Sequence, residues 1–108
     1  MSIAVELSDL PDTLAPYPWG YLVTVGPDLR AHVLAVPTRF LGGTFLFEAG
    51  RSTRANAAAR PEVTLVFPPI EPHGYSLLVD GSAVVHDAHI EVRPSTAVLH
   101  RPAITASE

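Results

Sequence analysis

Residues 44–67 read TFLFEAGRSTRANAAARPEVTLVF, and they join two strand patterns through a helix pattern. Apolar side chains alternate over Thr44–Glu48, as they do in a strand with one buried face. Four alanines favour a helix over Thr53–Arg60, and Ser52 is a residue type that caps helices. The apolar run Val63–Phe67 then predicts another strand. This stretch therefore predicts a strand, a loop, a helix and a second strand in sequence.

The rest of the chain predicts further short strands. Eleven prolines and seven glycines divide it into segments rich in Val, Leu, Phe and Tyr, which favour β-structure. These segments are Tyr21–Val25, Arg30–Val36, Tyr75–Val85 with a break at Gly81, and Ile90–Val92. Pro94–His100 fits either a closing strand or a helical turn. The apolar spacing of Leu7–Leu14 fits short helical turns before the first strand.

We therefore expect a single, mainly β domain over residues 1–108. Six short antiparallel strands, with one short helix between the third and the fourth, favour a small barrel or sandwich. Pro37 lacks an N–H group, so it should end the second strand and leave nearby backbone groups free for other partners.

Composition excludes several classes of function. Seven arginines, no lysine and eleven acidic residues give a net charge of -4, so we expect no nucleic acid partner. The absence of cysteine excludes thiolate nucleophiles and thiolate metal sites. The five histidines lack the spacing of metal ligands. Ser52 is not in a nucleophile elbow, and no His and Asp are placed to complete a triad.

The sequence also predicts where the protein is found and how it assembles. The first ten residues lack the basic and apolar parts of a signal peptide, and the longest apolar runs fall far short of the ~18 residues of a membrane helix. We expect a cytoplasmic protein with no membrane partner. Hydrophobic residues make up 47% of the chain and charged residues 17%. So much apolar surface favours a homo-oligomer.

The segment Glu48–Asn56 has the features of an anion-binding loop. The N–H groups of the first helical turn point outward, and the helix dipole places partial positive charge there. Arg51 and Arg54 add charged donors that match phosphate oxygens, and the hydroxyls of Ser52 and Thr53 add further donors. The same residues also fit a purely structural role, in which Ser52 caps the helix and both arginines are solvated.

Taken in order along the chain, six segments resemble the pyridoxamine 5′-phosphate oxidase-like family, the FMN-binding split barrels. They are Gly20–Val25, Arg30–Val33, Phe45–Phe47, Thr53–Asn56, Arg60–Leu65 and Asp80–Ala83. The segment Ala97–Pro102 is similar to the ending of short bacterial members.

The resemblance implies a six-stranded Greek-key split barrel that forms a homodimer, with two cofactor sites at the interface. The cofactor would be FMN or the deazaflavin F420. Its phosphate would lie at the start of the helix, at Arg51, Ser52, Thr53 and Arg54. Its ring would lie against the end of the second strand, at Val36, Pro37 and Thr38, and against backbone near Ala49. Asn56 matches a family Asn in the same helix.

These expectations combine in an FMN- or F420-dependent oxidoreductase, in which the cofactor transfers a hydride to a small-molecule substrate and the protein supplies orientation and electrostatics. No side chain is nominated as a catalytic acid or base. Many family members carry Lys where this chain has Thr53. A non-catalytic dimeric flavin carrier or interaction module is therefore the rival hypothesis. A third, a haem-binding barrel, would need His32 or His100 as an axial ligand.

Overall fold

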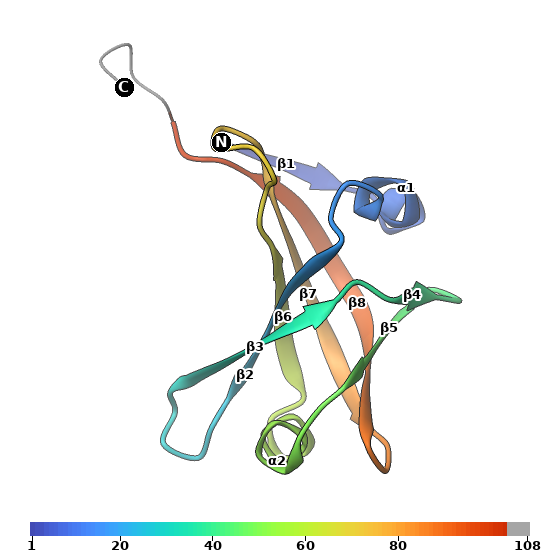
Figure 1. Cartoon of the computed structure of the whole chain (residues 1–108), viewed down its shortest axis with the longest axis vertical. Helices are drawn as coiled ribbons and strands as arrows, with labels where there is room; N and C mark the ends of the chain where they lie inside the picture. The colour runs from blue at the N-terminus through green and yellow to red at the C-terminus, as the bar shows by residue number, and fades with distance from the viewer. Residues whose placement is uncertain (104–108) are drawn as a thin grey trace.

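The computed structural model describes residues 1–103 as one curled antiparallel sheet with short helices at its ends (Figure 1). The remaining residues of the expected domain, 104–108, lie outside the described residues. The strands are β1 (Ser2–Val5), β2 (Trp19–Val25), β3 (Ala31–Pro37), β4 (Phe40–Leu41), β5 (Thr44–Glu48), β6 (Glu62–Phe67), β7 (Ser76–Val85) and β8 (His89–His100). The helices are η1 (Leu7–Asp9), α1 (Leu10–Leu14) and α2 (Arg51–Ala59).

The strands follow the order β3-β2-β6-β7-β8-β5-β4, and β1 pairs with the far end of β8. On the side of β8 away from β7, β5 pairs with His89–Val92 and β1 with Ala97–His100. The sheet curls so that β3, at one edge, comes close to β5 without a ladder between them. The prediction of a mainly β, antiparallel fold is confirmed, and the barrel is open between β3 and β5.

The number of strands differs from the prediction, because the sheet has eight strands rather than six. The two short strands β1 and β4 were not predicted. In addition, Ile90–Val92 and Pro94–His100 belong to one strand, β8. Proline is tolerated inside β8 because Pro94 lies at a register shift opposite Gly81, where the ladder is already irregular.

The predicted break at Gly81 is this bulge. The register between β7 and β8 shifts between Asp80 and Gly81. A Cβ atom at Gly81 would lie 2.5 Å from the carbonyl oxygen of Arg93. Only glycine allows the two strands to approach so closely here.

The helices also differ from the prediction of a single helix. The turns expected over Leu7–Leu14 form η1 and α1, with Pro11 in the first turn of α1, where its missing N–H is tolerated. α2 begins two residues earlier than expected, so its N-cap is Gly50 and not Ser52. Gly50 is extended, and its carbonyl accepts the N–H of Arg54 at 3.0 Å, which is the first bond of the helix. None of the helices described in residues 1–103 is long and apolar enough to cross a membrane.

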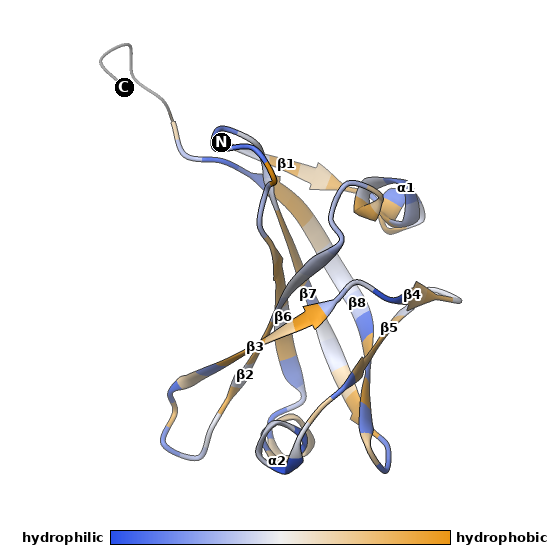
Figure 2. Ribbon diagram, in the orientation of Figure 1, coloured by the Kyte–Doolittle hydropathy of each residue, from blue (hydrophilic) through white to orange (hydrophobic). Residues whose placement is uncertain are grey.

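The core is formed mainly by β2, β5, β6 and β7, along which most alternate residues are buried. Phe45 and Phe67 stack with ring centroids 5.8 Å apart. α2 packs against β2 and β7 and covers one end of this core, while α1 lies near the other end (Figures 1 and 2). Residues on the opposite face of the strands are half-buried or exposed, and these supply the surfaces described below.

Candidate functional site

A groove of about 350 Å³ lies between the facing edges of β3 and β5. Its lining residues come from both strands and from the connection after β3: Leu34, Ala35, Val36, Pro37, Arg39, Leu46, Phe47 and Glu48. Val36 and Pro37, which the sequence predicts beside the cofactor ring, therefore lie in one wall. Ala49 comes directly after the other wall, as the residue that follows β5. The fold thus brings together two segments that are about ten residues apart in sequence.

Glu48, at the end of β5, lines the groove, and α2 begins three residues later at Arg51. The N–H groups of Arg51, Ser52 and Thr53 have no acceptor within α2, because the first turn of any helix lacks such partners. The side chains of Arg51 and Ser52 are exposed, and Thr53 is half-buried. The first turn of α2 therefore carries backbone donors, two hydroxyls and a guanidinium, three to five residues after a residue that lines the groove.

Arg54 has a structural contact in addition to its charge. Its Nη1 donates to the carbonyl oxygen of Ala49 at 2.7 Å, and the side chain is half-buried. This bond closes the loop between β5 and α2 on itself. A guanidinium carries five N–H donors, so further donors remain for another acceptor.

Thr38, which the sequence predicts beside the cofactor ring, does not line this groove. Its N–H donates to the carbonyl of Pro18 at 3.0 Å, and its Oγ1 donates to the carbonyl of Tyr17 at 2.6 Å. The backbone after Pro37 is therefore not left free at this position. The chain after Pro37 continues alongside the residue before β2, and Thr38 lines a separate cavity beside α1.

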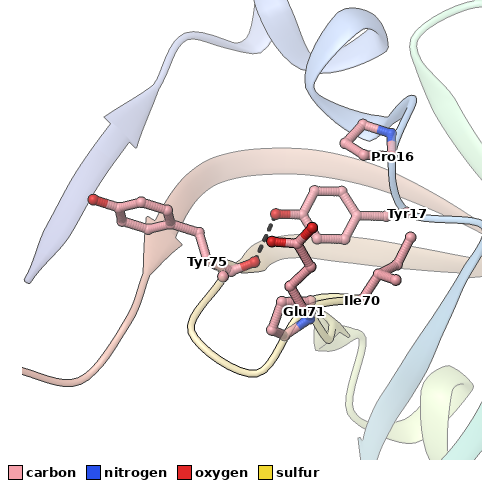
Figure 3. A pocket seen from close by; sticks show the side chains of 7 residues that line it. Pro16, Tyr17, Ile70, Glu71 and Tyr75 are labelled. Carbon is pink, nitrogen blue, oxygen red and sulfur yellow. Dashed lines mark hydrogen bonds between the residues drawn. The ribbon is translucent and has the colours of Figure 1, made fainter. Parts of the chain in front are cut away.

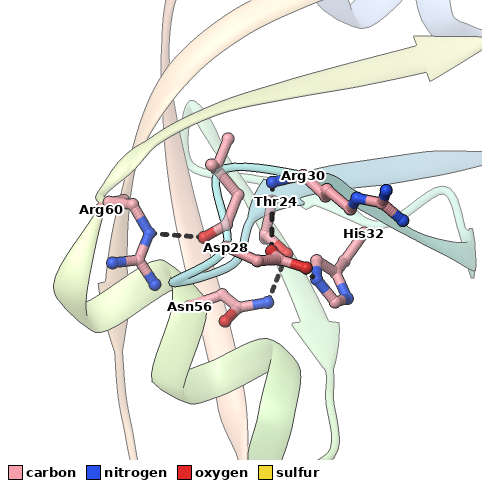
Figure 4. A network of polar contacts seen from close by, with 7 residues as sticks. Thr24, Asp28, Arg30, His32, Asn56 and Arg60 are labelled. Atoms are coloured by element: carbon pink, nitrogen blue, oxygen red, sulfur yellow. Dashed lines mark hydrogen bonds and ion pairs between the residues drawn. The ribbon is translucent and has the colours of Figure 1, made fainter.

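Asn56 lies inside the protein, between α2 and β2. Its side chain is buried, and Nδ2 donates to the buried hydroxyl of Thr24 at 3.4 Å. Arg60, just after α2, donates from Nε to the carbonyl of Val25 at 2.6 Å. Figure 4 shows these residues together between the helix and the β2–β3 hairpin. They fix the helix to the sheet.

The two candidate haem ligands lie at opposite ends of the sheet (Figure 1). His32 is near the tip of the β2–β3 hairpin, where Nε2 is 3.6 Å from Oδ1 of Asp28. The backbone N–H of Arg30 also donates to Asp28, and this bond is the main reason that the pKa of Asp28 is lowered. The ring of His100 instead contacts the hydroxyl of Ser2 at 3.1 Å.

A second cleft, of about 280 Å³, lies at the end of the molecule away from α2 (Figure 3). Tyr17 and Pro16 form one side, and the loop that carries Ile70 and Glu71 forms the other. The Tyr17 hydroxyl donates to the carbonyl of Tyr75 at 2.7 Å, and burial raises the pKa of this hydroxyl. No motif in the sequence indicated this cleft, because its residues come from two separate loops. Within residues 1–103, no cluster of His, Asp and Glu side chains could hold a metal ion.

Comparison with known proteins identifies relatives of the whole domain. No family model matches the chain. An uncharacterised protein of Mycobacterium bovis and another of Mycobacterium tuberculosis are each 40% identical over 116 aligned positions, which cover 92% of this chain and 82% of each relative. The chain belongs to the same family as these two mycobacterial proteins.

Solved structures give the fold. A Listeria innocua protein assigned as a pyridoxamine 5′-phosphate oxidase superposes with a TM-score of 0.74 at 14% identity, over 86% of this chain and 96% of that one. The chain has the fold of the pyridoxamine 5′-phosphate oxidase-like split barrels. An F420 reductase matches with a TM-score of 0.64 at 22% identity, over 80% and 94% of the two chains. The FAD-binding protein of Mycobacterium smegmatis matches with a TM-score of 0.67 at 20% sequence identity. The match covers 94% of this chain and 100% of that protein.

Proposed function

We propose that this split barrel binds FMN, or F420 in its place, and acts as an oxidoreductase on a small-molecule substrate. The ring would occupy the groove between β3 and β5, and the phosphate would bind at the first turn of α2. The observation that carries the proposal is the continuity of these two places: Phe47 and Glu48 line the groove, and the chain reaches Arg51 three residues later.

The residues present suit such a ligand. A volume of about 350 Å³ is within the ~300–1,000 Å³ of small-molecule sites. Leu34, Val36 and Leu46 give the groove apolar walls that exclude water from a flat ring. Arg51 and the free N–H groups of α2 suit a phosphate. The printed names of an F420 reductase and an FAD-binding protein with this fold add support for a flavin-type ligand.

The chain's own residues bind and orient, while a bound flavin or deazaflavin supplies the hydride transfer itself. The bond from Arg54 to Ala49 fixes the loop, so the donors of the first turn are held in place before a phosphate arrives. The hydrogen bond from Asn56 to Thr24 also holds the same helix against β2. This preorganisation reduces the ordering cost of binding.

We further propose that the protein is a homodimer formed through the outer face of β2 and β3. The register pairs Trp19 with Pro37, Tyr21 with Ala35 and Val23 with Val33, which gives an apolar surface without a charged side chain in these pairs. Trp19 and Tyr21 are 42% and 36% exposed, and their rings meet edge to face at 5.0 Å. A surface of this kind suits a second copy, which presents the same apolar face across a two-fold axis.

The first test is the visible absorption spectrum of protein purified without added cofactor, with mass spectrometry of the small molecules released on denaturation. We expect FMN or F420, close to one per chain, and faster reduction of an electron acceptor when the reduced cofactor is supplied. If the cofactor binds saturably but the acceptor is not reduced faster, the protein is the flavin carrier of the rival hypothesis and not an oxidoreductase. A protein that binds neither cofactor would reject the proposal.

Arg54→Ala should weaken FMN binding by at least ~1 kcal/mol, because a charge-assisted hydrogen bond is lost. Isothermal titration calorimetry measures this change. Since Arg54 also closes the loop, Arg51→Ala is the companion variant, as it removes an exposed charge and leaves the loop intact. Arg30→Ala, in the β2–β3 hairpin, is the control. If both α2 variants bind FMN as well as the control does, the phosphate does not lie at α2.

Tyr21→Arg should convert the dimer into monomers, because it places a like charge on both copies in the middle of an apolar contact. Sedimentation velocity measures the mass. Leu41→Arg is a matched control, since Leu41 is 73% exposed and lies on β4, away from this face. A wild-type protein that sediments as a monomer would contradict the proposed dimer.

A further inference from the structure

One arginine lies in the wall of the groove between β3 and β5 and has no part in the site described above. Arg39, in the connection after β3, lines the groove together with apolar residues of both strands. Val36 and Phe47 are buried and form the floor of the groove. Arg39 and Glu48 are exposed, so they lie at its rim. Apolar walls with a few polar groups are the usual form of a small-molecule site, in which the polar groups fix the orientation of the ligand.

Hydrogen bonds fix the backbone on both sides of Arg39. Its carbonyl accepts the N–H of Leu46, another residue of the groove wall, at 3.1 Å. The preceding residue, Thr38, donates its N–H to the carbonyl of Pro18 at 3.0 Å and its hydroxyl to the carbonyl of Tyr17 at 2.6 Å. The backbone of Arg39 is therefore held beside Leu46 before any ligand arrives, which lowers the ordering cost of binding.

The guanidinium of Arg39 has no partner among residues 1–103. Four of the seven arginines in the sequence do have a side-chain partner there: Arg54, Arg60, Arg93 and Arg101. Of the other three, Arg51 is the cation proposed to hold the phosphate, and Arg30 lies in the β2–β3 hairpin. Arg39 is therefore the cation that lines the groove itself, and its N–H donors can serve a ligand.

The charges at the rim favour a carboxylate as the ligand of Arg39. A guanidinium pairs with carboxylates and phosphates through two parallel hydrogen bonds. Leu46 and Glu48 are two residues apart on β5, so they share a face of the strand, and Arg39 lies at the Leu46 end. Glu48 repels anions, and it repels a doubly charged phosphate more strongly than a singly charged carboxylate. The apolar walls favour an apolar body attached to that carboxylate.

We propose that Arg39 binds the carboxylate of the substrate, so that the small molecule on which this protein acts is an apolar organic acid in its anionic form. The carboxylate lies at the rim beside Leu46, and the apolar body lies between β3 and β5. The binding of a carboxylate at Arg39 depends on the groove alone. Its identity as a group of the substrate rests on the proposed function, with the cofactor ring deeper in the same groove.

The test is an NMR titration of the isotope-labelled full chain, without cofactor, with benzoate as the probe. We expect saturable shifts of the Leu46 amide and the Arg39 Nε–H signals, with a dissociation constant in the millimolar range of a ligand with few atoms. Benzamide keeps the ring without the charge, and acetate keeps the charge without the ring, so each should bind at least about fivefold more weakly. Absence of binding, equal binding of either analogue, or shifts at Ser52 in place of Leu46 would overturn the proposal.

Three variants assign the binding to Arg39. Arg39→Gln should weaken benzoate binding at least about tenfold, because the charge-assisted pair is lost. Arg30→Gln is the matched control, since it removes another exposed arginine, in the β2–β3 hairpin, and should bind as the wild type does. Glu48→Gln removes a like charge from the rim, so it should bind benzoate at least as tightly as the wild type. Unchanged binding in Arg39→Gln, or weaker binding in Glu48→Gln, would count against the assignment.

The same titration with FMN bound tests whether the carboxylate belongs to the substrate. We expect benzoate to bind to the FMN-loaded chain and to lose affinity again in Arg39→Gln. If FMN displaces benzoate, the two cannot share the groove, and the assignment of the carboxylate to the substrate is rejected. If FMN does not bind at all, the proposed function fails, while the titration without cofactor still decides whether Arg39 binds a carboxylate.

Discussion

The two sides of this barrel are built differently. On the closed side, β7 pairs with β6 and β8 along its length, and Leu65, Val79 and Val92 are completely buried. On the open side, β3 has a ladder with β2 alone, and Val33 is 60% exposed. The closed side therefore holds the fold together. The open side leaves backbone edges and apolar side chains for a ligand and a second copy.

Among variants that compare the two sides, Phe67→Ala should cause the largest loss of stability. Phe67 is fully buried on β6 and packs against the rings of Phe45 and Tyr17. Its loss should lower the free energy of unfolding by about 3–5 kcal/mol, measured by urea denaturation. Leu41→Ala, on the exposed β4, should change it by less than about 0.5 kcal/mol. Equal losses in the two variants would remove the distinction between the two sides.

Gly81→Ser should have an intermediate effect. Its Cβ would meet the Arg93 carbonyl, a backbone atom that cannot move aside without breaking the ladder. We expect a loss of about 1–3 kcal/mol by the same denaturation assay. Gly50→Ser is the matched change on the open side, where a Cβ meets no atom within 4 Å and serine is a good N-cap. A loss there as large as in Gly81→Ser would show that the loop before α2 is as tightly packed as the bulge.

Glu91→Gln should give the smallest change in the free energy of unfolding, and only at pH values where Glu91 is ionised. The hydrogen bond from His86 lowers the pKa of Glu91 in the folded protein, so the ionised form stabilises the fold above the unfolded value, about 4.3. That contribution is lost as pH falls through the lowered folded pKa. Urea midpoints of wild type and variant should therefore differ at pH 7 and converge in acid. A difference that is constant with pH would exclude ionisation of Glu91 as its source.

Local pattern was enough to predict most of the closed side. An apolar run identified β6, and a break was expected at Gly81 in β7. At the edge of the opening, alternating apolar residues identified β5. β1 and β4 were missed because four and two residues carry too little periodicity, and they form only because β8 and β5 offer them free edges. Pro94 divided β8 in the sequence, since nothing local reveals that the ladder is irregular at that point.

The residues of the candidate site stay predictions, and the structure shows where they lie. The sequence indicated Val36, Pro37 and the Arg51–Arg54 segment, and the fold does bring them to one groove and the helix beside it. Thr38 was placed beside the ring with them, yet it does not line this groove, and the carbonyls of Tyr17 and Pro18 accept its hydroxyl and its N–H. Tertiary partners of this kind, about twenty residues away, are not visible in a local pattern.

The position of β8 has a consequence for how the chain folds. This strand holds β7, β5 and β1, and its pairing joins Ser2 to His100, almost the full length of the described chain. Contacts so distant in sequence make folding slow, because long loops must close before their ladders form. During synthesis the first strand has to wait for the last one, and its edge stays exposed to other chains until residues 97–100 leave the ribosome.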